Sequence, residues 1–226
     1  MTVIALQLQA VLQRVAQACN ACGRDPSEVT LLAVSKTFGP EAVRAAATAG
    51  QRAFGENYIR EAVDKISVLA DPGLEWHCIG PIQGNKTRIV AEHFAWAQTV
   101  DRLRIAQRLS EQRPAHLPPL QVCLQVNVDG GPTKSGVPPA EVPELAHAVA
   151  QLPRLRLRGL MCIPDPQPDP RAMVEVFARA RELYDRLRTQ GMPLDTLSMG
   201  MSADLEQAIE AGSTMVRVGT AIFGSR

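Results

Sequence analysis

The chain has 226 residues, of which 46% are hydrophobic and 21% are charged, and its formal net charge is +1. This length favours one domain with a sizeable core, and the near-neutral charge gives no indication of binding to nucleic acid or to a membrane surface. The apolar runs are far shorter than the roughly 18 residues of a membrane span. Because the N-terminus lacks a basic region and has glutamines at 7, 9 and 13, we expect no signal peptide and a cytoplasmic protein.

Strands and helices are predicted to alternate along the chain. Apolar residues at helical spacing between 4 and 19, followed by Gly23, predict a first helix. A buried strand at 29–35 and an Ala-rich helix at 41–50 come next. Later strands are predicted at 52–56, 75–80, 96–100, 120–128, 156–163, 195–200 and 214–219, and later helices at 57–69, 85–93, 101–112, 139–150, 170–190 and 203–211.

Strands that alternate with helices indicate parallel pairing through right-handed crossovers, and eight such units close into a (β/α)8 TIM barrel. Since that barrel typically takes about 250 residues, we expect residues 1–226 to form one domain, with the first helix added to the barrel. A doubly wound open sheet is the alternative, because it uses the same units. The Gly- and Pro-rich loops 129–139 and 164–170 follow strands, so they are expected at the face that carries the site.

The five cysteines favour reduced, mostly buried thiols, since a disulfide framework usually has an even number. Cys19 and Cys22 form a lone CxxC pair on a predicted helix, and no second ligand pair accompanies it. We therefore expect packing there and predict no metal site.

The first strand ends on Lys36. In a parallel barrel the carboxyl ends of the strands meet where binding loops gather, so this lysine is predicted to face the mouth of the barrel. A lysine in a partly desolvated pocket can act as a nucleophilic amine, whereas arginine cannot form a Schiff base. The simpler interpretation is a lysine that extends into solvent. Lysine is rare among the 24 lysine and arginine residues, occurring only at Lys36, Lys65, Lys86 and Lys134.

Residues suited to bind phosphate follow the last two strands. Ser202 comes after the seventh strand as the predicted N-cap of a helix, and Gly219 and Thr220 follow the eighth. Barrels frequently bind phosphate with the loops after these strands. Arg217 lies between two valines of the eighth strand. It points either outward, paired with a helix carboxylate, or inward, into the cavity that Lys36 faces.

A Schiff-base lysine, a phosphate site and an arginine between them suit an aldehyde that carries a phosphate, and pyridoxal 5′-phosphate (PLP) has both groups. The motifs AVSKT, FGENY, WHCIGPIQGNK, RLRGLMCI, SMGMS and RVGTAIFG occur in this order over nearly the whole chain. They resemble the YggS/PROSC family of pyridoxal phosphate homeostasis proteins.

This resemblance implies a barrel similar to the N-terminal domain of alanine racemase, with PLP held as a Schiff base on Lys36. It implies phosphate contacts from Ser202, Gly219 and Thr220, and it places Arg217 near the pyridine nitrogen. The cofactor-binding residues that it implies are Lys36, Asn57, Ser202, Arg217, Gly219 and Thr220. The implied function is that of a PLP carrier or regulator of vitamin B6 and amino-acid homeostasis, without established catalytic turnover. Its partners would be PLP and PLP-dependent apo-enzymes, and we expect a monomer.

Two enzymatic alternatives use the same lysine. A PLP-dependent amino-acid racemase of the alanine racemase type takes its second base, a tyrosine, from a β-domain, for which we expect this length to leave no room. The tyrosines here are Tyr58, beside the GEN motif, and Tyr184, for which surface packing is expected. A Schiff-base aldolase needs no phosphate site beside an arginine. An arginine at the pyridine nitrogen weakens the ring as an electron sink, which suits a carrier.

His77 and Lys86 also lie in the family motifs, but no role is predicted for them. A histidine on a strand is expected to be a core residue with its hydrogen bonds satisfied. A lysine at the start of a helix is expected to be solvated.

Overall fold

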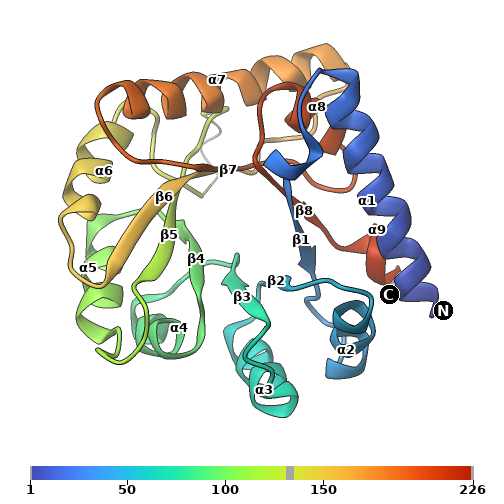
Figure 1. Ribbon diagram of the computed structural model, residues 1–226. Helices are drawn as coiled ribbons and strands as arrows, with labels where there is room; N and C mark the ends of the chain where they lie inside the picture. Colours follow the sequence, from blue (N-terminus) through green and yellow to red (C-terminus); the bar gives the residue numbers. More distant parts are fainter. Residues whose placement is uncertain (1, 131–134, 225–226) are drawn as a thin grey trace.

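The computed structural model describes residues 2–130 and 135–224. Its parallel strands form a closed barrel in sequential order (Figure 1). The predicted TIM barrel is confirmed, and the open sheet is wrong, because the last strand pairs with the first. The strands are β1 Thr30–Val34, β2 Ala53–Glu56, β3 Glu75–Cys78, β4 Trp96–Val100, β5 Leu120–Gln125, β6 Leu155–Met161, β7 Thr196–Ser198 and β8 Met215–Val218.

The helices surround the barrel (Figure 1). They are α1 Val3–Ala21, α2 Pro40–Thr48, α3 Ile59–Leu69, α4 Thr87–His93, α5 Leu103–Gln112, α6 Val142–Ala150, α7 Pro170–Thr189, α8 Leu205–Glu210 and α9 Thr220–Phe223. Each predicted helix is present with its ends moved by a few residues, whereas α9 was not predicted. None of the helices built from described residues has the length and apolarity needed to cross a membrane.

Two predicted boundaries are wrong, the end of the fifth strand and the start of the helix after the seventh strand. The strand predicted to run to residue 128 ends at Gln125, and Val126 makes only an isolated bridge to Val137. The helix predicted to begin after Ser202 begins at Leu205, so Ser202 is not its N-cap. Asp204 takes that position, and its carboxylate accepts a hydrogen bond from the Met201 amide at 2.6 Å, which tightens the turn before the helix.

Strand residues alternate between the interior of the barrel and the layer beneath the helices. Leu32 of β1 and Met215 of β8 belong to a small apolar cluster inside the barrel. Val216 and Val218 belong to the outer core that the helices cover. Since neighbouring residues of a strand point to opposite sides, Arg217 points inward with Met215. This decides between the two orientations that the sequence left open.

The added helix α1 packs on α8 and α9, beside which it lies in Figure 1. Arg14 of α1 forms an ion pair with Glu206 of α8, and its Nη1 donates to the Ser202 carbonyl at 2.8 Å. The helix α1 therefore stabilises the turn that follows β7. Cys19 is fully buried on its inner face, as the packing interpretation predicted, and burial raises the pKa of this thiol.

Candidate functional site

The residues predicted to form a site lie at the carboxyl ends of adjacent strands. Lys36 follows β1, Asn57 follows β2, Ser202 follows β7, and Gly219 and Thr220 follow β8. In the barrel these strands stand in the order β7, β8, β1 and β2. Closure of the barrel thus gathers residues from both ends of the chain on one side of its mouth.

The two predicted phosphate hydroxyls lie close together. Thr220 Oγ1 is 3.4 Å from Ser202 Oγ, so both can reach one acceptor group. At Gly219 an added Cβ would lie 3.1 Å from the Val34 carbonyl oxygen, tighter than most real contacts. The absence of a side chain there lets the end of β8 pack against the end of β1. The arrangement can present hydroxyl donors to a ligand oxygen beside β1.

Arg217 is a buried cation held by neutral groups. Its side chain is 4% exposed, Nη1 donates to Ser198 Oγ at 2.7 Å, and Nη2 donates to the Cys162 carbonyl at 2.8 Å. No carboxylate of the described residues lies within ion-pair distance of it, and burial lowers the pKa of its guanidinium. A buried charge without a counter-ion costs free energy, so this position suits an anionic or electron-rich ligand.

Lys36 is half-buried. It follows Leu32 and Val34 at two-residue spacing, and these two residues point into the barrel. Within the described part of the chain, its ammonium has no hydrogen bond or ion pair, so the amine has no competing partner. The next residue, Thr37, has a φ of 68°, in the left-handed region that β-branched residues avoid. Such strain persists only where surrounding groups over-determine the backbone.

A buried ion cluster supplies that constraint, and the sequence reasoning missed it. Lys65 of α3 is 3% exposed, and each of its three ammonium hydrogens has an acceptor. These acceptors are the Ser35 carbonyl at 2.8 Å, Glu56 Oε1 at 2.7 Å and Glu61 Oε1 at 2.6 Å. We call Glu56, Glu61 and Lys65 the ion cluster. Lys65 therefore has no ammonium hydrogen left for a ligand.

The ion cluster holds the backbone on both sides of Lys36. Before the lysine, the Ser35 hydroxyl donates to Glu56 Oε1 at 2.6 Å. After it, the Thr37 amide donates to Glu61 Oε1 at 2.5 Å. Burial raises the pKa of the Glu56 carboxyl, and hydrogen bonds from Lys65 and Ser35 oppose this shift. The signals in the sequence were a glutamate on a buried strand and an i,i+4 pair of opposite charge on the next helix.

Two side-chain acceptors beside this cluster are buried without a donor from the described residues, Asn57 Oδ1 and Glu56 Oε2. The backbone at Asn57 is closely packed, because a Cβ at Gly80 would lie 2.1 Å from the Asn57 carbonyl oxygen. Glycine at position 80 is therefore required for this contact. Buried acceptors without donors at the mouth fit a site that is completed by a ligand.

The other residues singled out from the sequence differ in their exposure. His77 is fully buried on β3, as expected of a core histidine. Tyr58 is 54% exposed. Tyr184 was expected at the surface, but it is 4% exposed and its hydroxyl donates to the Leu194 carbonyl at 3.1 Å, because α7 turns this face onto the barrel. Lys86 is half-buried just before α4.

The two long loops at the mouth contact each other. The Asp165 amide, in the loop after β6, donates to Asp129 Oδ2, in the loop after β5, at 2.7 Å. Residues 131–134, which include Lys134, lie outside the described residues. The expectation that both loops decorate one face of the barrel therefore holds for their described parts.

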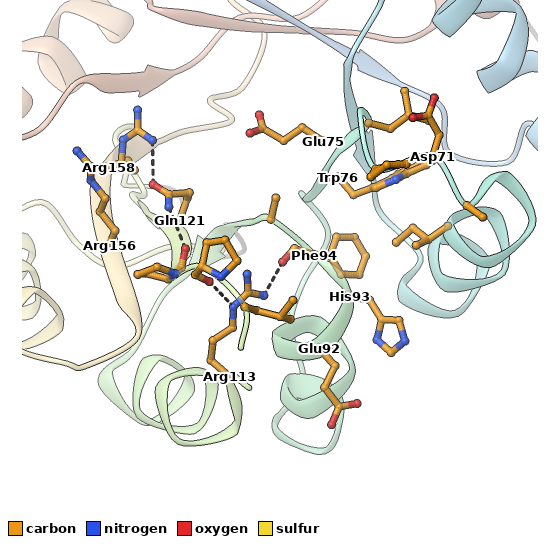
Figure 2. A pocket seen from close by; sticks show the side chains of 18 residues that line it. Asp71, Glu75, Trp76, Glu92, His93, Phe94, Arg113, Gln121, Arg156 and Arg158 are labelled. Atoms are coloured by element: carbon orange, nitrogen blue, oxygen red, sulfur yellow. Dashed lines mark hydrogen bonds between the residues drawn. The ribbon is translucent and has the colours of Figure 1, made fainter. Parts of the chain in front are cut away.

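A cavity of about 860 Å³ lies at the opposite end of the barrel, around the first residues of β3, β5 and β6 (Figure 2). None of the predicted site residues lines it. Two of its arginines have structural roles: Arg113 donates to the carbonyls of Ala91 and Phe94, and Arg158 forms a two-pronged ion pair with Asp195. The predicted site is thus at the mouth and distinct from this basal cavity.

A family model described as "Alanine racemase, N-terminal domain" matches residues 6–226. A protein of Pseudomonas aeruginosa named "Pyridoxal phosphate homeostasis protein" is 60% identical over 226 residues, which are 100% of this chain and 97% of that protein. The chain belongs to the YggS/PROSC family of pyridoxal phosphate homeostasis proteins. The resemblance read from its motifs is confirmed.

Solved structures agree with membership of this homeostasis-protein family. PipY of Synechococcus elongatus, solved with PLP bound, is 37% identical with a TM-score of 0.86, and the match covers 98% of this chain and 100% of that one. Alanine racemase of Clostridium difficile is 13% identical with a TM-score of 0.76, over 95% of this chain and 56% of that one. The latter likeness shows a shared barrel fold.

Replacing Lys65 with Met should destabilise the protein, because it leaves Glu56 buried without its counter-ion. We expect the free energy of unfolding in urea to fall by about 3–5 kcal/mol near neutral pH. The loss should shrink toward about pH 5, because burial raises the pKa of Glu56 and protonation then removes the uncompensated charge. Adding Glu56→Gln to Lys65→Met should recover part of the loss.

The control is Lys86→Met, whose ammonium has no ion pair with a described residue. It should change the stability by less than about 0.5 kcal/mol. Equal effects of the two single substitutions, or a loss in Lys65→Met that does not depend on pH, would show that the ion cluster is not a stabilising element.

Proposed function

We propose that this chain, as a single domain of residues 1–226, holds PLP as a Schiff base on Lys36 and carries or regulates PLP in vitamin B6 and amino-acid homeostasis. The observation that carries the proposal is that a lysine without an ion pair among the described residues, two neighbouring hydroxyls and a buried arginine belong to the adjacent strands β7, β8 and β1 and the turns that follow them. It is supported by the PLP-bound structure of the relative PipY. A cytoplasmic location, a monomeric state and transfer to PLP-dependent apo-enzymes are parts of the same proposal.

The residues present fit the chemistry of PLP, which supplies an aldehyde carbon and an electron-accepting ring when it is bound. Lys36 supplies the amine, in a strained turn that the ion cluster immobilises. The hydroxyls of Ser202 and Thr220 would donate to phosphate oxygens, and Gly219 lets the end of β8 that carries Thr220 pack against the end of β1. The amide of Asn57 adds an acceptor that no described residue uses.

The environment expected for the PLP ring favours a PLP-binding protein over an enzyme. The buried side chain expected at the ring nitrogen is the guanidinium of Arg217, which donates hydrogen bonds and favours an unprotonated nitrogen. Neither tyrosine is placed as the second base of a racemase, since Tyr58 is mostly exposed and the Tyr184 hydroxyl is bound to a backbone carbonyl under α7. These features support binding without catalytic turnover over the racemase.

Borohydride reduction of the PLP-loaded protein, followed by peptide mapping, should place the pyridoxyl label on the peptide that contains Lys36. The physical reason is that Lys36 has no hydrogen bond or ion pair with a described residue, whereas the Lys65 ammonium already has three acceptors. Lys36→Ala should abolish labelling, and the control Lys86→Ala should retain it. A label found mainly on Lys65, Lys86 or Lys134 would refute the assignment.

Removing a phosphate hydroxyl should weaken the binding of PLP more than that of pyridoxal, which has no phosphate. Loss of a charge-assisted hydrogen bond is worth about 1.5–3 kcal/mol, so Ser202→Ala or Thr220→Val should raise the Kd for PLP about ten- to a hundredfold. The control Thr189→Val removes a hydroxyl that bonds only within α7 and should leave both affinities unchanged. If a site variant weakens both ligands equally, the phosphate binds elsewhere.

A further inference from the structure

A continuous chain of hydrogen bonds crosses the interior of the barrel from Arg217 near the mouth to Glu75 at the basal cavity. Arg217 Nη1 lies 2.7 Å from Ser198 Oγ, which lies 2.7 Å from Gln98 Oε1. Gln98 Nε2 lies 2.9 Å from His77 Nδ1, and His77 Nε2 lies 2.9 Å from Glu75 Oε1. The chain links β8, β7, β4 and β3, and all its members except Glu75 are buried. We call it the relay.

Elementary donor and acceptor rules give the relay one direction. A guanidinium only donates, so Ser198 Oγ accepts from Arg217 and turns its own hydrogen toward Gln98 Oε1. The Gln98 amide nitrogen then donates to His77 Nδ1, which must carry no proton. The ring proton is therefore on Nε2 and is donated to the Glu75 carboxylate.

The environment of His77 agrees with this single neutral tautomer. Burial lowers the pKa of the His77 imidazole, and the hydrogen bond from His77 lowers the pKa of the Glu75 carboxyl. The imidazole stacks on the Trp96 ring, with centroids 5.0 Å apart and planes inclined by 11°. On Trp96 also lies the Arg158 guanidinium, 4.8 Å from the ring centroid. The imidazole is thus fixed in both rotation and protonation.

We propose that Ser198, Gln98 and His77 are positioning residues that orient the Arg217 guanidinium toward the ring of bound PLP. The inference rests on the proposed function, since it assumes that PLP lies at the mouth. Arg217 is held by hydrogen bonds to the Ser198 hydroxyl and the Cys162 carbonyl and forms no ion pair with a described carboxylate, so the direction of these bonds sets its orientation. A serine hydroxyl alone rotates freely, but Gln98 fixes the direction of the Ser198 hydrogen and hence of the lone pair that holds Arg217.

The outer end of the relay is anchored in the basal cavity. Glu75 lines that cavity (Figure 2), and its side chain is 49% exposed, so the terminal carboxylate is hydrated. A hydrated carboxylate is a strong acceptor that stays ionised near neutral pH. It therefore holds the proton of His77 on Nε2, and the direction of the whole relay follows from its two charged ends.

The relay is tested first in the apo-protein, by ¹⁵N NMR of the histidine rings. We expect His77 as a neutral imidazole protonated at Nε2, and we expect its ¹⁵N shifts to change in Gln98→Met. The matched control is Gln51→Met, because Gln51 is also buried but donates to the Leu31 and Ala53 carbonyls, outside the relay. A His77 that is protonated at Nδ1, or at both nitrogens, overturns the proposed direction.

The second arm uses the PLP-loaded protein. Loss of one hydrogen bond in the relay should speed PLP release about five- to tenfold in Gln98→Met and shift the absorption maximum of the bound cofactor. Gln51→Met should leave both unchanged. His77→Gln keeps one acceptor and one donor, whereas His77→Phe keeps only the stacking on Trp96. The rate of PLP release and the absorption maximum should therefore change less in His77→Gln than in His77→Phe.

Equal effects of Gln98→Met and Gln51→Met on release and spectrum would overturn the positioning role. If Gln98→Met does not fold, Ser198→Ala tests the same link next to Arg217, with the same expected direction of change. A wild-type protein that fails to bind PLP would refute the proposed function, and the tautomer of His77 in the apo-protein would still decide the direction of the relay.

Discussion

The pairing of β8 with β1 is the contact on which the rest of this molecule depends. In that pairing Leu32 lies opposite Arg217 and Ala33 opposite Val218, so the residues that follow the two strands emerge side by side. The pairing therefore brings Val34, two residues before Lys36, against Gly219, although nearly the whole chain separates them in sequence. It also turns Arg217 into the interior, since the register fixes which residues of β8 face inward. Without closure of the barrel, the Lys36 amine and the Arg217 guanidinium would not belong to the same site.

The backbone at Lys36 is held rigid by the ion cluster, whose charges cost desolvation free energy when they are buried. A buried ion pair is weak evidence for stability, because desolvation offsets much of its attraction. Here the ion cluster is better understood as a constraint on the backbone, since it binds the residues immediately before and after Lys36 and maintains the positive φ of Thr37. A preorganised amine loses less conformational entropy when a ligand binds. This suits a protein whose task is to hold a cofactor.

The sequence predicted the elements better than it predicted their contacts. Hydrophobic periodicity placed every strand, and the rule that barrel sites gather at strand ends singled out Lys36, Ser202 and Thr220. It could not orient Arg217, because that depends on the register between β8 and β1. It missed the ion cluster and the relay, because both join side chains from separate elements. It misplaced Ser202 as an N-cap because Asp204, two residues later, is an equally good capping residue.

A crystal structure of the protein soaked with PLP tests the central claim most directly. The account predicts continuous density from the Lys36 amine to the cofactor, with the phosphate against Ser202, Gly219 and Thr220 and with the ring nitrogen facing Arg217. Density that joins PLP to another lysine, or a bound PLP whose ring nitrogen lies away from Arg217, would contradict it.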